Sequence, residues 1–114
     1  MGAAGAGVVG GARRVSLAAL NYGLLVEGIC WQCHEPLTHI LDWGECVECG
    51  RRFQIRGREV TEQIAVEDEW RGKNVCLGAE RVLLADGTVI VPPDNGMVHM
   101  PWSAEWVVCR WSLR

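Results

Sequence analysis

The sequence predicts a small α+β domain that is mostly β. Three observations support this fold class: the length of the chain, an alternation of apolar and polar residues at 51–58, and a hairpin pattern at 81–91. A chain of 114 residues has the size of one ordinary domain. With 49% hydrophobic and 22% charged residues, it has enough apolar side chains to form a core. We therefore expect one folded domain over residues 15–114.

Residues 1–14 are almost entirely Gly, Ala and Val before two arginines, and we expect a flexible tail there. The arginines and the moderately apolar residues 15–26 superficially match an export signal, but the polar and flexible residues 21–23 interrupt it. No apolar run approaches the roughly 18 residues that span a bilayer. We therefore expect a cytoplasmic protein with no membrane partner.

The first elements surround two cysteine pairs. Residues 24–31 contain Leu, Val and Ile around one acidic residue, which favours a strand, and residues 36–45 are expected to form a loop. In residues 51–58, Phe53 and Ile55 alternate with polar side chains, which is typical of a half-buried strand.

Residues 59–70 fit two patterns. Val60 and Ile64 have helical spacing, whereas Thr61 and Val66 would also suit a strand. We assign this segment to a helix.

The second half contains the clearest hairpin. Residues 81–85 are apolar and β-prone, an Asp-Gly pair supplies a tight turn, and residues 88–91 return before two prolines. Residues 102–111 hold three tryptophans separated by Val, Val and Cys, among other residues. This composition predicts a closing strand that is apolar on both faces.

Two cysteine pairs with C-x-x-C spacing are separated by 12 residues. Two residues between thiolates let one tight turn aim both sulfurs at a single ion, and two such turns can close a tetrahedron around zinc. Gly50 follows the second pair and lets the chain turn sharply there. We therefore predict one structural zinc ion held by Cys30, Cys33, Cys46 and Cys49.

Residues 24–58 resemble the zinc-ribbon family of small metal-binding modules at five positions, namely Cys30, Cys33, Cys46, Cys49 and Gly50. The resemblance implies the order strand, knuckle, loop, knuckle, strand, where a knuckle is the turn that carries a C-x-x-C pair. The expected architecture is then a zinc ribbon followed by a β-hairpin and a Trp-rich closing strand. Zinc ribbons have diverse partners, so the resemblance does not identify one.

Some residues beside the cysteines need a separate interpretation. His34 follows the first pair where glycine is commoner, so it is either a neighbour of the ligands or a substitute ligand. Trp31 and Trp43 flank the knuckles and could shield the sulfurs from water or stack on bases, and we favour shielding. Cys76 and Cys109 lie in apolar, β-prone surroundings, and we expect both to be small core residues.

Other chemistries are compatible with six cysteines. Iron in a rubredoxin-like site would use the same four thiolates. Disulfides would require an oxidising compartment, for which no convincing export signal is present.

The sequence lacks the motifs of common catalytic sites, including a Gly-rich phosphate loop, G-x-S-x-G and H-E-x-x-H. A site of four cysteines would also leave zinc no open coordination position. We therefore expect a non-enzymatic, zinc-stabilised binding module that docks onto a protein assembly. Trp106 and Trp111 stand in the most apolar stretch and are the expected interface anchors.

Direct nucleic-acid binding is the first alternative function. Arg52, Arg56 and Arg58 fall at alternate positions on one face of the predicted strand and could contact phosphates, as in the zinc-ribbon modules of transcription and translation factors that this region resembles. The net charge of −3 argues against a generally basic surface, and the arginines could instead pair with the acidic residues 67–69. A rubredoxin-like electron carrier is the second alternative.

Overall fold

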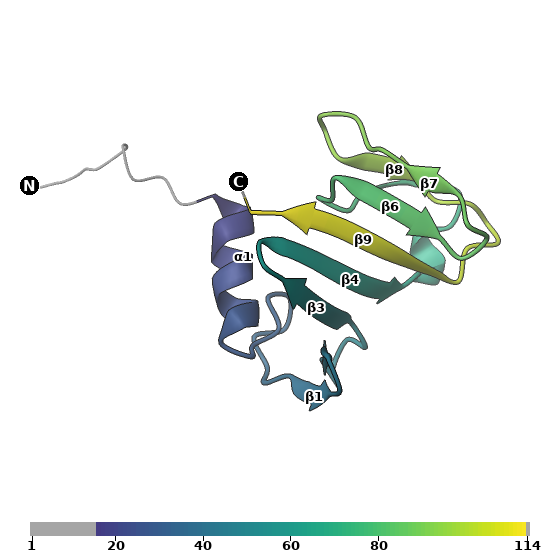
Figure 1. Cartoon of the computed structure of the whole chain (residues 1–114). Helices are drawn as coiled ribbons and strands as arrows, with labels where there is room; N and C mark the ends of the chain where they lie inside the picture. The colour runs from purple at the N-terminus through teal and green to yellow at the C-terminus, as the bar shows by residue number, and fades with distance from the viewer. Residues whose placement is uncertain (1–15, 114) are drawn as a thin grey trace, which may run out of the picture.

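The computed structural model describes residues 16–113 (Figure 1). Within these residues the strands form an antiparallel seven-stranded sheet, in the order β1-β2-β3-β4-β9-β6-β7, and a two-stranded sheet of β5 and β8. This confirms the mostly β fold class. The tail expected at 1–14 lies outside the described residues.

The elements are α1 (Leu17–Val26), β1 (Thr38–Ile40), β2 (Trp43–Glu45), β3 (Arg52–Arg56), β4 (Glu59–Ala65), the 3-10 helix η2 (Asp68–Trp70), β5 (Asn74–Cys76), β6 (Arg81–Leu84), β7 (Val89–Ile90), β8 (Met97–His99) and β9 (Trp106–Ser112).

Helix α1 overlaps the region where we predicted a strand at 24–31, so that prediction is wrong. Ser16 caps the helix, because its side-chain oxygen accepts a hydrogen bond from the backbone N–H of Ala19 at 3.1 Å. Ala18, Tyr22 and Leu25 have helical spacing and pack against the core. The helix contains no charged residue, so no polar face marked it in the sequence. Among residues 16–113, no helix combines the length and apolar character needed to cross a bilayer.

The loop predicted at 36–45 contains a hairpin of β1 and β2. Thr38 pairs with Glu45 and Ile40 with Trp43, and β2 then pairs with β3. The strand predicted at 51–58 is confirmed as β3, with Phe53 buried.

The prediction of a helix at 59–70 is also wrong, because residues 59–65 form strand β4. Val60, Glu62 and Ile64 alternate as buried residues, and the strand pairs with β3 and β9. Two residues four positions apart, such as Val60 and Ile64, share a face in a strand as well as in a helix. The long pairing with β9, from Glu59 opposite Ser112 to Ala65 opposite Trp106, favours the strand.

The predicted hairpin is confirmed as β6 and β7, with Val82 opposite Ile90. The predicted closing strand is confirmed as β9, which lies between β4 and β6 in the sheet. Its side chains alternate between the core and the opposite face. Val107, Cys109 and Trp111 are buried.

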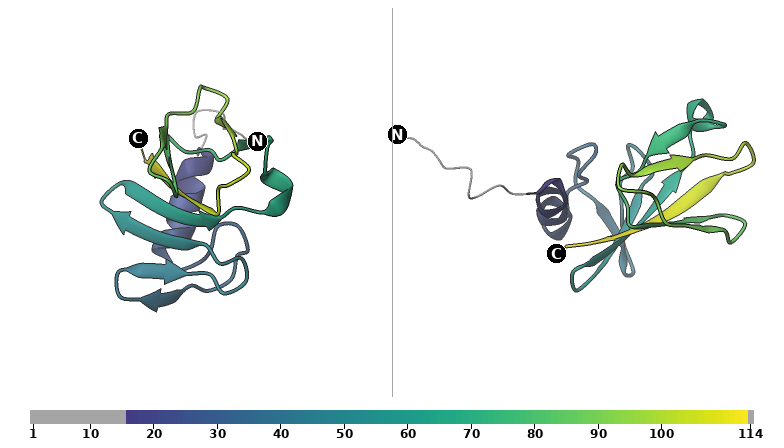
Figure 2. Two further views of the ribbon diagram at one scale, coloured as in Figure 1. Left: turned by 90° about the vertical axis from the view of Figure 1, so that its right-hand side faces the viewer. Right: turned by 90° about the horizontal axis from the view of Figure 1, so that it is seen from above.

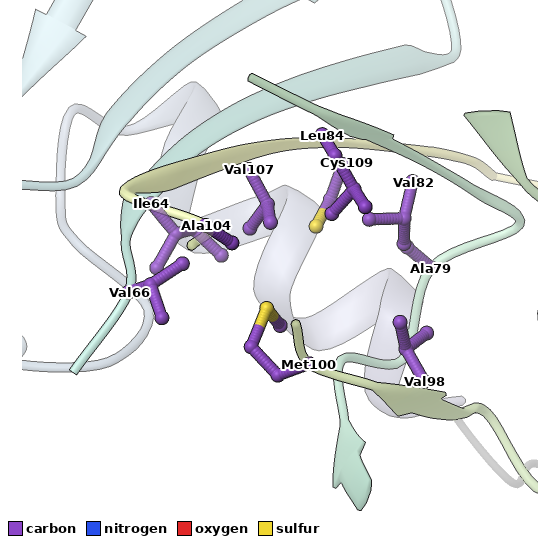
Figure 3. Packing of buried hydrophobic residues seen from close by; sticks show 10 residues of the cluster. All are labelled: Ile64, Val66, Ala79, Val82, Leu84, Val98, Met100, Ala104, Val107 and Cys109. Carbon is purple, nitrogen blue, oxygen red and sulfur yellow. The ribbon is translucent and has the colours of Figure 1, made fainter. Parts of the chain in front are cut away.

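One face of the sheet carries both parts of the core. The first cluster of buried residues gathers around β6, β8 and β9 (Figure 3). The second joins α1 and the knuckles to β3, β4 and β9, and its buried members are Leu25, Cys30, Cys46, Phe53, Val60 and Trp111. Figures 1 and 2 show α1 at one end of the sheet and β8 at the other. The opposite face of the sheet contains no buried side chain among the described residues of β3, β6, β7 and β9.

Candidate metal centre

The four predicted ligand cysteines lie together. Their sulfur atoms are all within 4.8 Å of one another, and the sulfurs of Cys30 and Cys49 are 3.9 Å apart. A tetrahedral ion with metal–sulfur distances of about 2.3 Å has sulfur–sulfur edges of roughly 3.8 Å. Cys30 and Cys46 are buried, whereas Cys33 and Cys49 are half-buried. The donor set and its spacing therefore fit one tetrahedral metal ion.

The two knuckles have the same backbone hydrogen bonds. The N–H of His34 donates to the carbonyl oxygen of Cys30 at 2.7 Å, and the N–H of Gly50 donates to that of Cys46 at 2.8 Å. The N–H of Cys30 and the N–H of Cys46 each donate at 2.9 Å to the carbonyl five residues later. Each cysteine pair therefore sits in an equivalent tight turn.

His34 occupies the position that Gly50 occupies in the second knuckle. Both have positive φ, 59° for His34 and 75° for Gly50, in the left-handed region that favours glycine. The His34 side chain is exposed and lies outside the four-thiol cluster. Aligning the two C-x-x-C pairs in the sequence matches His34 with Gly50, and it would have indicated that His34 adopts the left-handed backbone conformation.

The thiols influence each other's ionisation. Burial raises the pKa of Cys30 to about 11, and hydrogen bonding to Cys49 raises the pKa of Cys33 to about 12. Burial also acts to raise the pKa of Cys49, but hydrogen bonds from the backbone and side chain of Arg51 and from neighbouring cysteines outweigh it and lower the pKa to about 7. Four thiolates at this distance repel one another, so holding all of them ionised requires a cation between them.

Trp31 is half-buried beside the cluster. It packs against the core that contains Cys30 and Cys46, and the guanidinium carbon of Arg51 lies 5.4 Å from the centre of its ring. The expected shielding of the sulfurs stays a prediction. Trp43 is half-buried in β2, opposite Ile40.

A buried carboxylate, which the sequence did not reveal, lies beside the centre. Glu62 is 3% exposed, and one of its oxygens accepts hydrogen bonds from the indole N–H groups of Trp31 at 3.0 Å and Trp111 at 2.7 Å. In the sequence it is an ordinary acidic residue, because only the strand pairing places it on the core face. Its two tryptophan partners are distant in the sequence, one in the first knuckle and the other in the last strand.

The tryptophans are distributed differently from our expectation. Trp111 is only 8% exposed and bonded to Glu62, so the prediction that it anchors an exposed interface is wrong. Trp106 is half-buried at the start of β9. Trp102 is 75% exposed, in the turn before that strand. Trp111 is buried because it stands at a core-facing position of β9 and packs in the second core cluster.

The three predicted arginines do not all lie in one strand. Arg52 and Arg56 are exposed at the ends of β3, whereas Arg58 is exposed in the turn that follows it. Arg52 pairs with Glu45 through Nε and Oε2 at 3.1 Å, and not with the acidic residues 67–69. The expected row therefore has two arginines on the strand itself.

The two remaining cysteines differ. Cys109 is 1% exposed in the core, as predicted, but Cys76 is exposed in β5, so its predicted burial is wrong. Both are free thiols. The sulfur of Cys76 lies 3.7 Å from the carbonyl oxygen of Asn95.

In comparisons with known proteins, no protein-family model, no curated protein and no solved structure matches this chain. The similarity to a zinc ribbon therefore rests on the two knuckles and the cluster of four thiols.

Proposed function

We propose that this chain is a non-enzymatic, zinc-stabilised module that docks onto a protein assembly through the uncovered face of its sheet. The observation that carries the proposal is a set of outward side chains on this face, none of which is buried. We call this surface the open sheet face, and its residues are Arg52, Gln54, Arg56, Glu59, Thr61, Gln63, Arg81, Leu83, Val89, Trp106, Val108 and Arg110.

Zinc has a structural role in this proposal. Four cysteine thiolates complete the coordination of a tetrahedral ion, so the metal fixes the knuckles and is closed to substrates. Cys30 and Cys46 belong to the second core cluster together with Phe53 and Val60 of the sheet. Metal binding therefore supports the sheet that carries the docking surface.

The open sheet face has apolar side chains on the three strands nearest the β7 edge, namely β9, β6 and β7. Val108 lies opposite Leu83, and Leu83 lies opposite Val89, so the three are neighbours on three adjacent strands. Leu83 is 38% exposed and Val89 61%. Contiguous exposed apolar side chains with polar neighbours are typical of protein interfaces, whereas isolated ones are ordinary.

Nucleic-acid binding is the second candidate, because the same face carries four arginines, at 52, 56, 81 and 110, and the strand register places two acidic residues, Glu45 and Glu59, beside them. Arginines on a flat sheet can contact phosphates without reading a sequence. Binding of this kind would weaken steeply with salt.

Affinity capture from an extract of cells that naturally produce the chain tests the docking function. The immobilised proteins are the wild type, Val89→Lys and, as the matched control, Leu41→Lys, which changes a 96% exposed leucine in the β1–β2 turn. Metal content and circular dichroism confirm that each variant folds. We expect a defined set of proteins to bind the wild type and Leu41→Lys after nuclease treatment and to be lost with Val89→Lys. Release by nuclease supports the second candidate instead.

A further inference from the structure

We propose that a hollow on the open sheet face binds an extended acidic segment of the partner protein, in which Asp or Glu stands two residues from Leu, Ile or Val. This inference rests on the proposed docking function and specifies the chemistry of the partner. The hollow has a volume of about 200 Å³ and is lined by Arg81, Val82, Leu83, Val89, Val108 and Arg110.

The hollow has an apolar part and a basic part. Leu83, Val89 and Val108 are neighbours across three strands and form the apolar part. Arg81 precedes Leu83 by two residues, and Arg110 follows Val108 by two residues, so both guanidinium groups lie on the same side of it. Residues two apart in a strand are about 6.6 Å apart along the chain.

The two arginines carry positive charge that the fold compensates only in part. Arg81 lies directly opposite Arg110, and like charges at opposite positions of adjacent strands disfavour the pairing. Arg81 approaches Glu59 with an Nη2–Oε2 distance of 3.8 Å, but both side chains are about half exposed, so this ion pair is weak. Among residues 16–113, Arg110 makes no ion pair. A carboxylate from a partner would satisfy both guanidinium groups.

An extended peptide matches this layout. Its alternate side chains point to one side and repeat at the same spacing as Val108 and Arg110. A carboxylate at one position would therefore reach the arginines while an aliphatic side chain two positions away covers the apolar part. The preferred pattern is [Asp or Glu]-x-[Leu, Ile or Val], in either chain direction.

The hollow is less suited to nucleic acid. Single-stranded nucleic acids gain affinity by stacking bases on aromatic side chains, and the residues that line this hollow are aliphatic or arginine. Trp106, on the same face, is half-buried and does not line it. The combination of an arginine pair with an aliphatic surface therefore favours a peptide.

Selection from a phage-displayed library of random 12-residue peptides against the full chain with zinc is the first test. We expect enrichment of peptides with the acidic-x-aliphatic pattern. The most enriched peptide is then titrated by fluorescence anisotropy against the wild type and Arg81→Gln Arg110→Gln, where we expect about tenfold weaker binding. The matched control is Arg56→Gln Arg58→Gln, which removes the same charge from exposed arginines outside the hollow. It should change the affinity by less than about twofold at 0.15 M salt.

The inference is overturned if no acidic-aliphatic peptides are enriched, if both arginine variants weaken the peptide equally, or if a 15-residue oligo(dT) binds tighter than the peptide and depends on Arg81 and Arg110. Cellular partners provide a separate readout. If partners lost with Val89→Lys are still captured by Arg81→Gln Arg110→Gln, the docking function stands and this inference fails. If the peptide binds as expected but the extract yields no protein partner, the hollow is supported and the docking function fails.

Discussion

Trp31 and Trp111 donate their indole N–H groups to the same carboxylate oxygen of Glu62, at 3.0 and 2.7 Å. Trp31 lies inside the first cysteine pair, whereas Trp111 belongs to the last strand of the sheet. Glu62 itself is on the central strand β4, between the core residues Val60 and Ile64. One buried carboxylate therefore connects the metal-binding segment to the middle of the sheet.

Replacing Glu62 by alanine should destabilise the fold strongly. The change would leave the indole N–H groups of Trp31 and Trp111 without their acceptor, and each such loss costs about 1–3 kcal/mol. We expect a decrease of about 2–4 kcal/mol in the free energy of unfolding, measured by urea denaturation with zinc present. Glu62→Gln keeps a carbonyl acceptor and should cost less. Equal stability of Glu62→Ala and the wild type would contradict the role of the carboxylate.

The pH dependence of stability should also report on Glu62. Burial raises the pKa of this carboxyl above its ordinary value of 4.5, although hydrogen bonds from Trp111 and Trp31 and the charge of Arg51 act in the opposite direction. At a pH between the pKa of Glu62 in the unfolded chain, which is 4.5, and its higher pKa in the folded chain, the folded chain keeps a proton that the unfolded chain has lost. The free energy of unfolding should therefore fall as the pH rises from about 4.5 to the pKa of the folded state, and then stop changing.

Glu62→Gln provides the reference for this pH effect, because it lacks the titrating group and keeps the surrounding cysteines and metal. Urea denaturation of both proteins over a series of pH values gives the difference in their stability. We expect the wild type to lose stability relative to Glu62→Gln as the pH rises. A relative gain of the wild type would mean that the folded state lowers the pKa of Glu62.

The sequence predicted the metal ligands and the β6–β7 hairpin because both depend on local spacing. Two cysteines in one tight turn, or an Asp-Gly pair between apolar runs, fix their geometry within a few residues. Helix α1 was missed because it contains no charged residue that would mark a polar face. Strand β4 was missed because Glu62 breaks the apolar alternation, and its burial depends on Trp31 and Trp111, which are distant in the sequence. The open sheet face likewise depends on strand order, which local patterns do not determine.

The cysteine cluster should hold about one equivalent of zinc per chain. Elemental analysis of protein purified without added metal measures the content, and Cys46→Ser Cys49→Ser should lose it. Because binding is coupled to folding, metal removal should speed amide hydrogen exchange in residues 28–53, including the N–H groups of His34 and Gly50. Stoichiometric iron with a coloured absorption band would support the rubredoxin-like alternative, and unchanged zinc in the double variant would contradict the ligand assignment.

The position after each cysteine pair should respond to substitution through its backbone. His34→Gly should preserve zinc content and leave stability equal or higher, because glycine adopts the φ of 59° without strain. Gly50→Ala should lower stability by about 1 kcal/mol, although open space surrounds the added methyl group. Thermal unfolding with zinc present measures both effects. Loss of zinc in His34→Gly would instead show that the imidazole contributes to metal binding.

Cys76 and Cys109 should differ in both reactivity and contribution to stability. Cys76 is exposed, whereas burial raises the pKa of Cys109 to about 12, so little thiolate forms there at neutral pH. With zinc protecting the other four thiols, iodoacetamide should alkylate Cys76 in the native protein and reach Cys109 only after unfolding. Peptide mapping by mass spectrometry identifies the modified residue.

The corresponding alanine variants separate packing from reactivity. Cys109→Ala removes a buried sulfur from the core beside Val107 and should cost roughly 1–2 kcal/mol, whereas Cys76→Ala should stay within about 0.5 kcal/mol of the wild type. Zinc content should be unchanged in both, because neither sulfur belongs to the four-thiol cluster. Loss of zinc in either variant, or alkylation of Cys109 ahead of Cys76, would contradict these assignments.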